Sequence, residues 1–357
     1  MLSLNAQDYF EGRKDLRLAF LQTYLGNDCT VLPLAADWAS RRYFRVRAAG
    51  GGKSRVLMEA VPDHTGAYTP GHKIADFLRI ARALKAHGIH APSIIAADEG
   101  EGYVLLEDFG DLSAYDALEQ AASGRGVSSA QDIYAQAVDI LIALRGTVDA
   151  DALSLPDYYS SHVHKGRRRI VDWYIPAVRR AKNQDGLVES YLAAWDEVER
   201  ALPPCPQGMV HGDYHMQNLM ILPGTLGVLD FQGAMRGPLP YDLANLLEDI
   251  RRDVPDDIHA AMLERYGGGE DFRAWFRVMA TQFHCRILGQ ILRLAVAGGR
   301  TDMLGFIPRV QAYLKRGLSD PALAPLARWM EAEKVDLDAA GCFAPEEMKY
   351  FIRGDAF

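Results

Sequence analysis

The sequence predicts an α+β fold, in which a small antiparallel sheet precedes a larger and mainly helical part. Three short apolar runs near the N-terminus have the pattern of strands, and the glycines 50–52 turn the second run into the third. After Asp108, apolar positions recur with helical spacing. A length of 357 residues suggests two lobes, because a domain has about 150 residues. We therefore expect an N-terminal lobe over residues 1–108 and a C-terminal lobe over residues 109–357.

The expected elements follow one another without an internal repeat. The N-terminal lobe has a helix over 14–25, strands over 30–34, 43–48 and 55–61, a helix over 73–86, and strands over 93–97 and 103–107. His87 and Gly88 end the second helix in the manner of a C-cap. The C-terminal lobe has helices over 113–121, 130–145 and 188–201, several more beyond 255, and a surface loop over 121–129.

Composition excludes several classes of protein. The net charge of -8 argues against a general nucleic-acid binder, which needs clustered Lys and Arg. The four cysteines are scattered and form no CxxC pair, so we expect free thiols without a disulfide framework or zinc knuckle. No apolar run approaches the ~20 residues of a membrane span, and Met1–Arg13 does not have the pattern of a signal peptide. We expect a cytoplasmic protein, monomeric or alternatively dimeric.

The stretch from Met209 to Asp230, MVHGDYHMQNLMILPGTLGVLD, is the most informative part of the chain. Two apolar runs flank a turn that contains Pro and Gly, which is the signature of a β-hairpin. A three-residue turn at 223–225 would place Asn218 opposite Asp230, with Cβ atoms about 5 Å apart. An amide oxygen and a carboxylate at this separation suit Mg²⁺, which takes few protein ligands and completes its shell with water and phosphate.

Asp213 precedes this hairpin and is the candidate catalytic base. Phosphoryl transfer depends mainly on positioning and charge neutralisation, so one carboxylate, two metal ligands and a nucleotide clamp are sufficient. The sequence therefore predicts a phosphotransferase that depends on Mg²⁺ and ATP. An alternative hypothesis uses His211, Asp213 and His215, which alternate as the metal ligands of a hydrolase would on a strand.

Four motifs of this chain resemble the aminoglycoside phosphotransferase and choline kinase branch of the protein-kinase-like fold. They are HGDYHMQN at 211–218, LDFQ at 229–232, YDLANLL at 241–247 and VLLEDFGD at 104–111. The resemblance implies a two-lobed kinase fold in which Asp213 is the base and Asn218 and Asp230 bind magnesium. It also implies an interlobe hinge at Glu107 and Phe109 that holds adenine. The remaining implied roles are structural support of the catalytic loop by His211 and Asp242.

A narrower resemblance joins ASRRYFRV at 39–46, the hinge, and GVLDFQGAMRGPLPYDLANLLED at 227–249. This combination is similar to the bacterial anomeric kinases of N-acetylmuramate and N-acetylglucosamine. It implies transfer of the γ-phosphate of ATP to the 1-hydroxyl of the sugar, in peptidoglycan recycling. An aminoglycoside or a choline-like acceptor remains the alternative.

One departure from the kinase pattern concerns the phosphates. Kinases carry a Lys on the third strand, paired with a Glu on the next helix, whereas this chain has Glu59 in that strand and offers Asp76 in the helix. No glycine-rich loop is present either, so the first strand pair would have to cover the phosphates. A catalytically silent nucleotide-binding protein is therefore a further alternative. The candidate nucleotide-binding residues of this strand pair are Arg41, Arg42, Tyr43 and Arg45.

Weaker signals indicate an acceptor site. The basic run KGRRR at 165–169 precedes an acidic residue and two aromatic residues. We interpret its arginines as a solvated helix face, and the alternative is that a basic residue of the run binds a carboxylate of the substrate. Asp172 would bind sugar hydroxyls and Trp173 would stack on the sugar ring, although the ring is equally compatible with a core position. Gln232 and Arg236, which follow the hairpin in the sequence, complete the candidate acceptor-binding set.

Overall fold

The computed structural model describes residues 9–34, 41–66, 73–126, 128–339 and 343–352. Contacts divide the chain into two compact units, which are described separately. Unit 1 comprises Met1–Ser154 and Met216–Ala234, and unit 2 comprises Leu155–His215 and Met235–Phe357. The predicted lobe boundary after residue 108 lies inside unit 1, where the sheet is followed by helices. As a division between lobes, that boundary stays a prediction.

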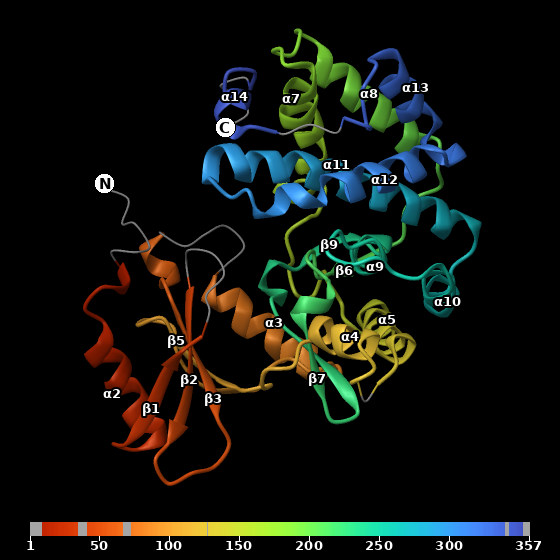
Figure 1. Cartoon of the computed structure of the whole chain (residues 1–357). Coiled ribbons are helices and arrows are strands. Elements are labelled where there is room, and N and C mark those ends of the chain that lie inside the picture. The colour runs from red at the N-terminus through yellow and green to blue at the C-terminus, as the bar shows by residue number, and fades with distance from the viewer. Residues whose placement is uncertain (1–8, 35–40, 67–72, 127, 340–342, 353–357) are drawn as a thin grey trace. The chain divides into compact units, whose positions relative to one another are not determined.

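Unit 1 contains a five-stranded antiparallel sheet of order β1-β2-β3-β5-β4 (Figure 1). Its strands are β1 (Cys29–Pro33), β2 (Arg41–Ala48), β3 (Arg55–Ala60), β4 (Ile94–Asp98) and β5 (Tyr103–Glu107). A separate hairpin pairs β7 (Leu219–Leu222) with β8 (Thr225–Val228). The helices of unit 1 are α2 (Lys14–Leu25), α3 (Ile74–Ala86), α4 (Ala114–Ala122), α5 (Ala130–Thr147), and the short η1 (Asp63–Thr65), η4 (Met216–Asn218) and η5 (Phe231–Gly233).

The alternation of side chains along β2 and β3 gives the sheet two apolar faces. On one face, Phe44 and Leu57 pack in a buried cluster with Leu21 of α2. On the other face, Tyr43 and Val56 line a cavity together with Phe77 of α3. The helices α2 and α3 therefore cover opposite faces, as Figure 1 also shows. The helical spacing in the sequence predicted both helices, and α2 has the predicted bounds.

Serine side chains fix the starts of the two helices that follow the sheet. Ser113 Oγ accepts the amide of Asp116 at the start of α4, and Ser129 Oγ accepts the amide of Asp132 at the start of α5. Such N-caps satisfy amides that have no partner inside the helix, each contributing about 1 kcal/mol. They explain why both helix starts were predicted within one residue.

Unit 2 is mainly helical and is centred on the long helix α11 (Glu270–Gly298), which packs against α9, α12 and η3. Its helices are α6 (His162–Lys165), η2 (Gly166–Arg168), η3 (Ile170–Tyr174), α7 (Ile175–Arg179), α8 (Leu187–Arg200), α9 (Pro240–Leu247), α10 (Asp256–Tyr266), α11, η6 (Asp302–Phe306), α12 (Ile307–Leu318), η7 (Pro321–Leu323), α13 (Ala324–Ala332) and α14 (Pro345–Met348). Its two strands, β6 (Gln207–Val210) and β9 (Met235–Pro238), pair antiparallel.

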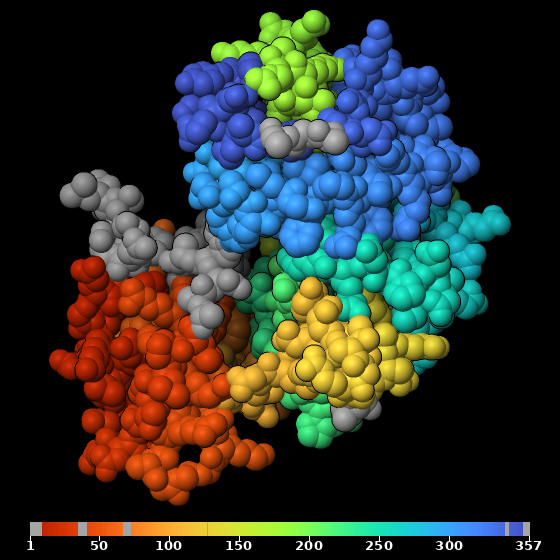
Figure 2. All heavy atoms as spheres, viewed as in Figure 1, coloured from red at the N-terminus to blue at the C-terminus, as the bar shows by residue number. Residues whose placement is uncertain are grey.

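The C-terminal segments of unit 2 pack on α7. In Figure 2 the lime-coloured segment around α7 lies directly against blue segments from the C-terminal part of the chain. Two ion pairs agree with this view, Arg179 with Glu333 at 3.3 Å and Arg180 with Glu347 at 2.6 Å.

Two predictions from composition can be compared with the structure. Cys29, Cys205 and Cys285 are free thiols, as predicted, while Cys342 lies outside the described residues. Among the helices of the described ranges, none combines the length and the apolar character needed to cross a membrane.

Candidate active site

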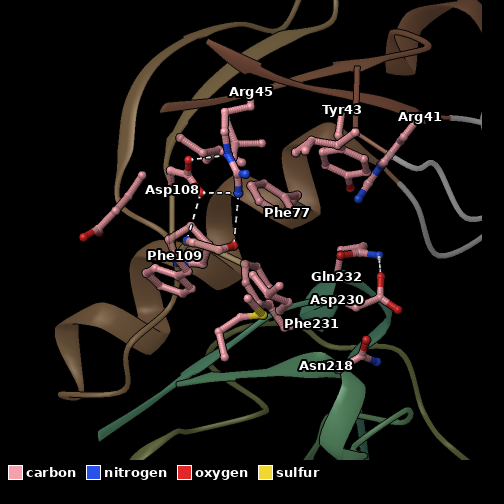
Figure 3. A pocket seen from close by; sticks show the side chains of 18 residues that line it. Arg41, Tyr43, Arg45, Phe77, Asp108, Phe109, Asn218, Asp230, Phe231 and Gln232 are labelled. Carbon is pink, nitrogen blue, oxygen red and sulfur yellow. Dashed lines mark hydrogen bonds and ion pairs between the residues drawn. The ribbon is translucent and has the colours of Figure 1, made fainter. Parts of the chain in front are cut away.

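Unit 1 contains a cavity of about 520 Å³ that brings most of the predicted nucleotide and metal residues together (Figure 3). Its walls come from β2, from α3, from the segment after β5 and from the hairpin region. In Figure 3, Arg45 and Phe109 lie at one side, and Arg41 lies at the side of Gln232 and Asp230. The lining residues are Leu34, Arg41, Tyr43, Arg45, Val56, Phe77, Pro92, Leu106, Glu107, Asp108, Phe109, Gly110, Asn218, Met220, Leu229, Asp230, Phe231 and Gln232.

The period of two along β2 decides which of its residues reach the cavity. Arg41, Tyr43 and Arg45 line it, and Arg41 is buried. Arg42 points to the opposite face, where its guanidinium lies 4.6 Å from the ring centroid of Phe10. Its predicted nucleotide contact therefore does not fit the structure, because neighbouring residues of a strand cannot share a face.

Arg45 is engaged by the segment that follows β5. Its Nε lies 2.7 Å from Asp108 Oδ2, its Nη1 lies 2.5 Å from Asp111 Oδ1, and its Nη2 donates to the Gly110 carbonyl at 3.1 Å. Burial raises the pKa of Asp108, but the hydrogen bonds from Ser54, Arg45 and Gly110 outweigh it and leave the pKa lowered. Arg45 thus fixes the hinge segment to β2, and its charge is already balanced by two carboxylates.

The hinge residues Glu107 and Phe109 are held from outside the cavity. Ser93 donates from its hydroxyl to Glu107 Oε2 at 2.7 Å, and Lys85 donates to that hydroxyl at 2.6 Å. The ring of Phe109 lies on Gly227 of β8, where an added Cβ would stand 2.4 Å from the ring. The glycine is therefore needed for the close approach of the hinge to the hairpin.

Glu59 stands in β3, the strand where kinases carry a lysine, but it lies on the face of the sheet away from the cavity. Glu59 is fully buried on the α2 side of the sheet, where it pairs with Arg13 at 3.3 Å and with Arg17 at 2.8 Å. It does not line the cavity. Glu59 thus fixes the helical N-terminal segment to β3, which sequence pattern alone did not indicate.

The hairpin register differs from the prediction by one residue. Leu222 pairs with Thr225, so the turn consists of Pro223 and Gly224 alone. Asn218 then stands opposite Leu229, whose amide donates to the Asn218 carbonyl at 2.9 Å. The prediction that Asn218 faces Asp230 across the hairpin was wrong, because a two-residue turn is the commonest hairpin connection.

Asn218 and Asp230 nevertheless line the same cavity. Asp230 has left-handed backbone angles, with φ 58° and ψ 32°, which end the strand and redirect its side chain. The amide of Gln232 donates to Asp230 Oδ1 at 2.6 Å, as the dashed line in Figure 3 marks. The predicted acceptor residue Gln232 therefore orients the carboxylate in this structure.

The predicted catalytic loop lies in unit 2, where Asp242 holds its backbone. Asp242 Oδ2 accepts the His211 amide at 2.5 Å, and Oδ1 accepts the Gly212 amide at 2.9 Å. Gly212 has φ 87°, a conformation that favours glycine. These contacts are the ones predicted for Asp242, at the first turn of α9. His211 is buried, and its Nδ1 accepts the Asp213 amide at 3.3 Å.

The Asp213 carboxylate is 56% exposed, and its Oδ2 lies 3.4 Å from His215 Nε2. Desolvation raises the pKa of Asp213, but the hydrogen bond and charge of His215, together with the charges of Arg286 and Arg251, outweigh it and leave the pKa lowered. Asp213 is therefore an ionised and accessible carboxylate at neutral pH.

The predicted acceptor residues of unit 2 are less accessible. Trp173 is only 1% exposed and belongs to the core, so a stacking contact with a sugar does not fit the structure. Asp172 lies in the π-helical turn η3 and pairs with Arg168 at 2.8 Å. Arg236 lies on β9, where its backbone pairs with Met209. The acceptor roles of Asp172 and Arg236 stay predictions.

The sequence profile of the phosphotransferase enzyme family matches residues 30–278. This match covers more than half of the chain. The chain belongs to the phosphotransferase enzyme family. It is thus a phosphotransferase, as predicted, and the hydrolase hypothesis is set aside. The described residues also contain no group of three His, Cys, Asp or Glu side chains placed to share a metal ion.

Curated relatives of this phosphotransferase match most of its length. The N-acetylmuramate/N-acetylglucosamine kinase of Pseudomonas aeruginosa is 30% identical over 310 residues, covering 83% of this chain and 86% of the relative. The protein of the same name from Caulobacter vibrioides is 28% identical over 357 residues, covering 89% and 96%. The narrower resemblance noted in the sequence is thus confirmed at the level of relatives.

Solved structures share the fold at low sequence identity. A choline/ethanolamine kinase family protein from Mesorhizobium loti has a TM-score of 0.56 at 14% identity, covering 89% of this chain and 99% of that one. Choline kinase LicA from Streptococcus pneumoniae has a TM-score of 0.56 at 11% identity, covering 87% and 98%. The predicted α+β fold of the protein-kinase-like class is confirmed.

Two aromatic residues of the cavity in this phosphotransferase were not predicted from the sequence. Phe77 of α3 and Phe231 of η5 stack with ring centroids 5.0 Å apart, and both line the cavity. Phe231 lies within the LDFQ motif, whose apolar residue could have been assigned to the cavity wall. Phe77 had no such signal, because an apolar position of an amphipathic helix looks the same whether it meets core or cavity.

Proposed function

We propose that this phosphotransferase transfers the γ-phosphate of ATP to the anomeric hydroxyl of N-acetylmuramate, N-acetylglucosamine or both, in peptidoglycan recycling. The observation that carries the proposal is the run of relatives bearing this name, at 28–30% identity over 83–89% of the chain. The cavity of unit 1 supports it, because a hinge segment and two oxygen ligands of metal type line one space. A spectinomycin phosphotransferase of similar fold is solved with ADP.

The two sides of the cavity offer different groups, and we propose that ATP lies across both. We assign the adenine to the side of Glu107 and Phe109, where backbone groups and an aromatic ring meet. We assign the phosphates to the side of Asp230 and Arg41. Arg45 is less suited to the phosphates, because Asp108 and Asp111 already balance its charge. Arg41 would thus take the role of the strand lysine, which removes the main argument for a silent protein.

The residues Asn218 and Asp230 fit a magnesium ion. They offer an amide oxygen and a carboxylate to one cavity, which is the hard oxygen set that Mg²⁺ prefers. Gln232 donates to one carboxylate oxygen of Asp230 and leaves the other available. The bound ion would neutralise charge on the transferred phosphate. In this proposal, Asn218 and Asp230 hold the ion, and Gln232 orients the carboxylate.

Asp213 is proposed to orient the acceptor hydroxyl and to accept its proton on a carboxylate oxygen. Its exposure allows contact with an acceptor, and its lowered pKa keeps it ionised. The loop that carries it is held by Asp242 through two backbone amides. The loop is thus preorganised, which matters more for phosphoryl transfer than a strong base.

The test is ADP release with ATP, Mg²⁺ and a panel of acceptors comprising both amino sugars, choline and an aminoglycoside. The proposal predicts turnover with an amino sugar and a matching loss of its reducing end, because phosphate on the anomeric oxygen blocks ring opening. Asp213→Asn should lower kcat by about 10²- to 10⁴-fold. The control Asp302→Asn changes an exposed carboxylate that pairs with Arg300 and should leave kcat unchanged. Turnover that keeps the reducing end, or that survives in Asp213→Asn, would contradict the proposal.

A further inference from the structure

The basic run at residues 165–169 is not the solvated helix face that its composition predicted. Arg167 is 7% exposed and pairs with Glu199 at 3.3 Å. Arg168 pairs with Asp172 at 2.8 Å. The third arginine, Arg169, has no such carboxylate at hydrogen-bond distance. Its surroundings therefore need a separate explanation.

Arg169 lies against a face of α11 that carries two further arginines. Arg286 and Arg293 are seven residues apart, so they project from one side of the helix. A Cβ added at Gly166 would lie 2.9 Å from Arg286 Cδ and 3.0 Å from Arg169 Nη1, which places both side chains around one point. We call Arg169, Arg286 and Arg293 the arginine cluster.

Glycine at position 289 makes this arrangement possible. Gly289 lies on α11 between the two arginines, and an added Cβ would stand 2.1 Å from the Arg169 carbonyl oxygen. The backbone that carries Arg169 therefore touches the backbone of α11. This close approach of the Arg169 backbone to α11 leaves no room for a side chain at position 289.

The arginine cluster is a concentration of like charge with only distant compensation. Within the described ranges of the chain, none of its three side chains makes a hydrogen bond or an ion pair, although Arg286 lies over the Phe283 ring. Arg286 Nε is buried without a hydrogen-bond partner. Burial, together with the charges of Arg286 and Arg293, lowers the pKa of Arg169 to about 10. Charges that lack a carboxylate at ion-pair distance are costly in a partly buried place, which suggests that an anion completes the cluster.

The cluster lies within electrostatic reach of the acceptor side of the active site. The charge of Arg286 acts on Asp213 and on Tyr241, both in unit 2. Asp172 and Tyr241 act in turn on Arg169. The helix α11, which carries Arg286 and Arg293, also packs against α9, whose Asp242 holds the loop of Asp213. An anion at the cluster is therefore placed to belong to the acceptor that meets Asp213.

We propose that the arginine cluster binds a carboxylate of the acceptor and so selects N-acetylmuramate over N-acetylglucosamine. This inference rests on the proposed function. The two sugars differ by a lactyl ether, which gives N-acetylmuramate a carboxylate that N-acetylglucosamine lacks. Guanidinium groups suit this group, because their planar fork donates two parallel hydrogen bonds to a carboxylate. The subsite therefore acts on specificity and not on phosphate transfer.

The experiment compares kcat/KM for the two sugars in Arg169→Gln and Arg293→Gln. Arg286 is left intact, because its charge also acts on Asp213. Each variant should lose about 10- to 100-fold for N-acetylmuramate, the range expected for one charged hydrogen bond. The value for N-acetylglucosamine should change less than about twofold. Turnover of this neutral sugar also reports that the variant is folded.

Two controls separate the subsite from general effects. Arg328→Gln removes an exposed arginine that pairs with Glu197 at 2.7 Å, and it should change neither value. Added salt should lower kcat/KM for N-acetylmuramate more than for N-acetylglucosamine, because it screens the charged contact.

The possible failures are distinguishable. If the unmodified protein phosphorylates neither sugar, the proposed function fails and the inference falls with it. If both sugars are phosphorylated but each cluster variant lowers both values equally, the cluster is structural and the inference alone is overturned. A raised KM for ATP with either sugar would assign the cluster to the nucleotide phosphates and would equally overturn it.

Discussion

Replacing Glu248 by glutamine would remove the negative charge at the centre of a buried ion cluster in unit 2. Glu248 directly follows α9 and is fully buried, and its Oε1 lies 2.7 Å from Arg277 Nη1 and 2.8 Å from Arg316 Nη2. His259 Nε2 is 3.5 Å from the same oxygen, and His284 Nδ1 is 3.7 Å from Oε2. This single carboxylate thus joins α9, α10, α11 and α12.

The expected loss follows from the burial of each partner. Removing one member of a buried pair costs about 3–5 kcal/mol, because the remaining charge is left uncompensated. Arg316 is 44% exposed and Arg277 is 16% exposed, so water would compensate part of the lost interaction. We therefore expect Glu248→Gln to lower the free energy of unfolding by about 3 kcal/mol. The corresponding fall in melting temperature is about 6–12 °C.

Urea unfolding and calorimetry at pH 7 measure this change. The matched control is Glu264→Gln, which removes an 80% exposed carboxylate paired with Arg273 at 3.1 Å. An exposed pair contributes about 0–1 kcal/mol, so the control should barely change unfolding. Equal and small effects of the two variants would refute the importance of burial for the Glu248 cluster.

The pH dependence provides a second check on Glu248. Burial raises the pKa of Glu248, but the hydrogen bond from His259 and the charges of His284, Arg277 and Arg316 outweigh it and lower the pKa. A lowered pKa contributes stability above the unfolded value of about 4.3, and this stability is lost as pH falls through the folded pKa. The difference between wild type and Glu248→Gln should thus be constant near neutrality and shrink below pH about 4.

Three further variants test unit 1 and the loop. Gly227→Ala should raise KM for ATP, because the new methyl group displaces the Phe109 ring that lies 2.4 Å away, and nucleotide titration would detect it. Asp242→Ala should lower kcat and destabilise the fold by about 1–3 kcal/mol, since the buried His211 amide loses its acceptor, while Asp242→Asn should be milder. Asn218→Ala should raise the Mg²⁺ concentration for half-maximal rate by about tenfold, and an unchanged magnesium response would contradict its role.

The order of elements was predictable because each depends on local pattern. Helical spacing of apolar residues indicated α4 and α5, and short apolar runs flanking the glycines 50–52 indicated β2 and β3. The hairpin was predictable as an element but not in its register. Pro223 and Gly224 fit either a two- or a three-residue turn, and a change of one residue moved Asn218 from opposite Asp230 to opposite Leu229.

Contacts between residues that are distant in sequence could not be predicted. The absence of a lysine from the third strand could be read from the sequence. The partners of Glu59, Arg13 and Arg17, lie more than forty residues earlier in the chain and could not be predicted. Likewise, the pairing of Asp108 and Asp111 with the Arg45 guanidinium could not be read from the sequence, and the nucleotide contact of Arg45 stays a prediction. A basic residue shows its charge in the sequence, whereas its partner is decided by tertiary packing.

The last prediction concerns the pH dependence of turnover. In the proposed mechanism, the lowered pKa of Asp213 makes it a weak base in the free protein, so its contribution would be to orient the acceptor hydroxyl. The proposal makes the ionised carboxylate the active form, so kcat/KM should fall only as pH drops through this lowered pKa. We therefore expect no acidic loss of kcat/KM due to Asp213 between about pH 8 and pH 5.

Removing the principal partner of Asp213 should move this limit. His215 Nε2 lies 3.4 Å from Asp213 Oδ2 and gives the largest of the effects that lower its pKa. In His215→Gln the pKa of Asp213 should rise, so that the acidic loss of kcat/KM begins at higher pH than in the wild type. The shape of the profile separates this effect from a general loss of activity, which would lower the curve without shifting it. A wild-type profile that already falls below pH 7, and that His215→Gln does not move, would mean that His215 leaves the ionisation of Asp213 unchanged.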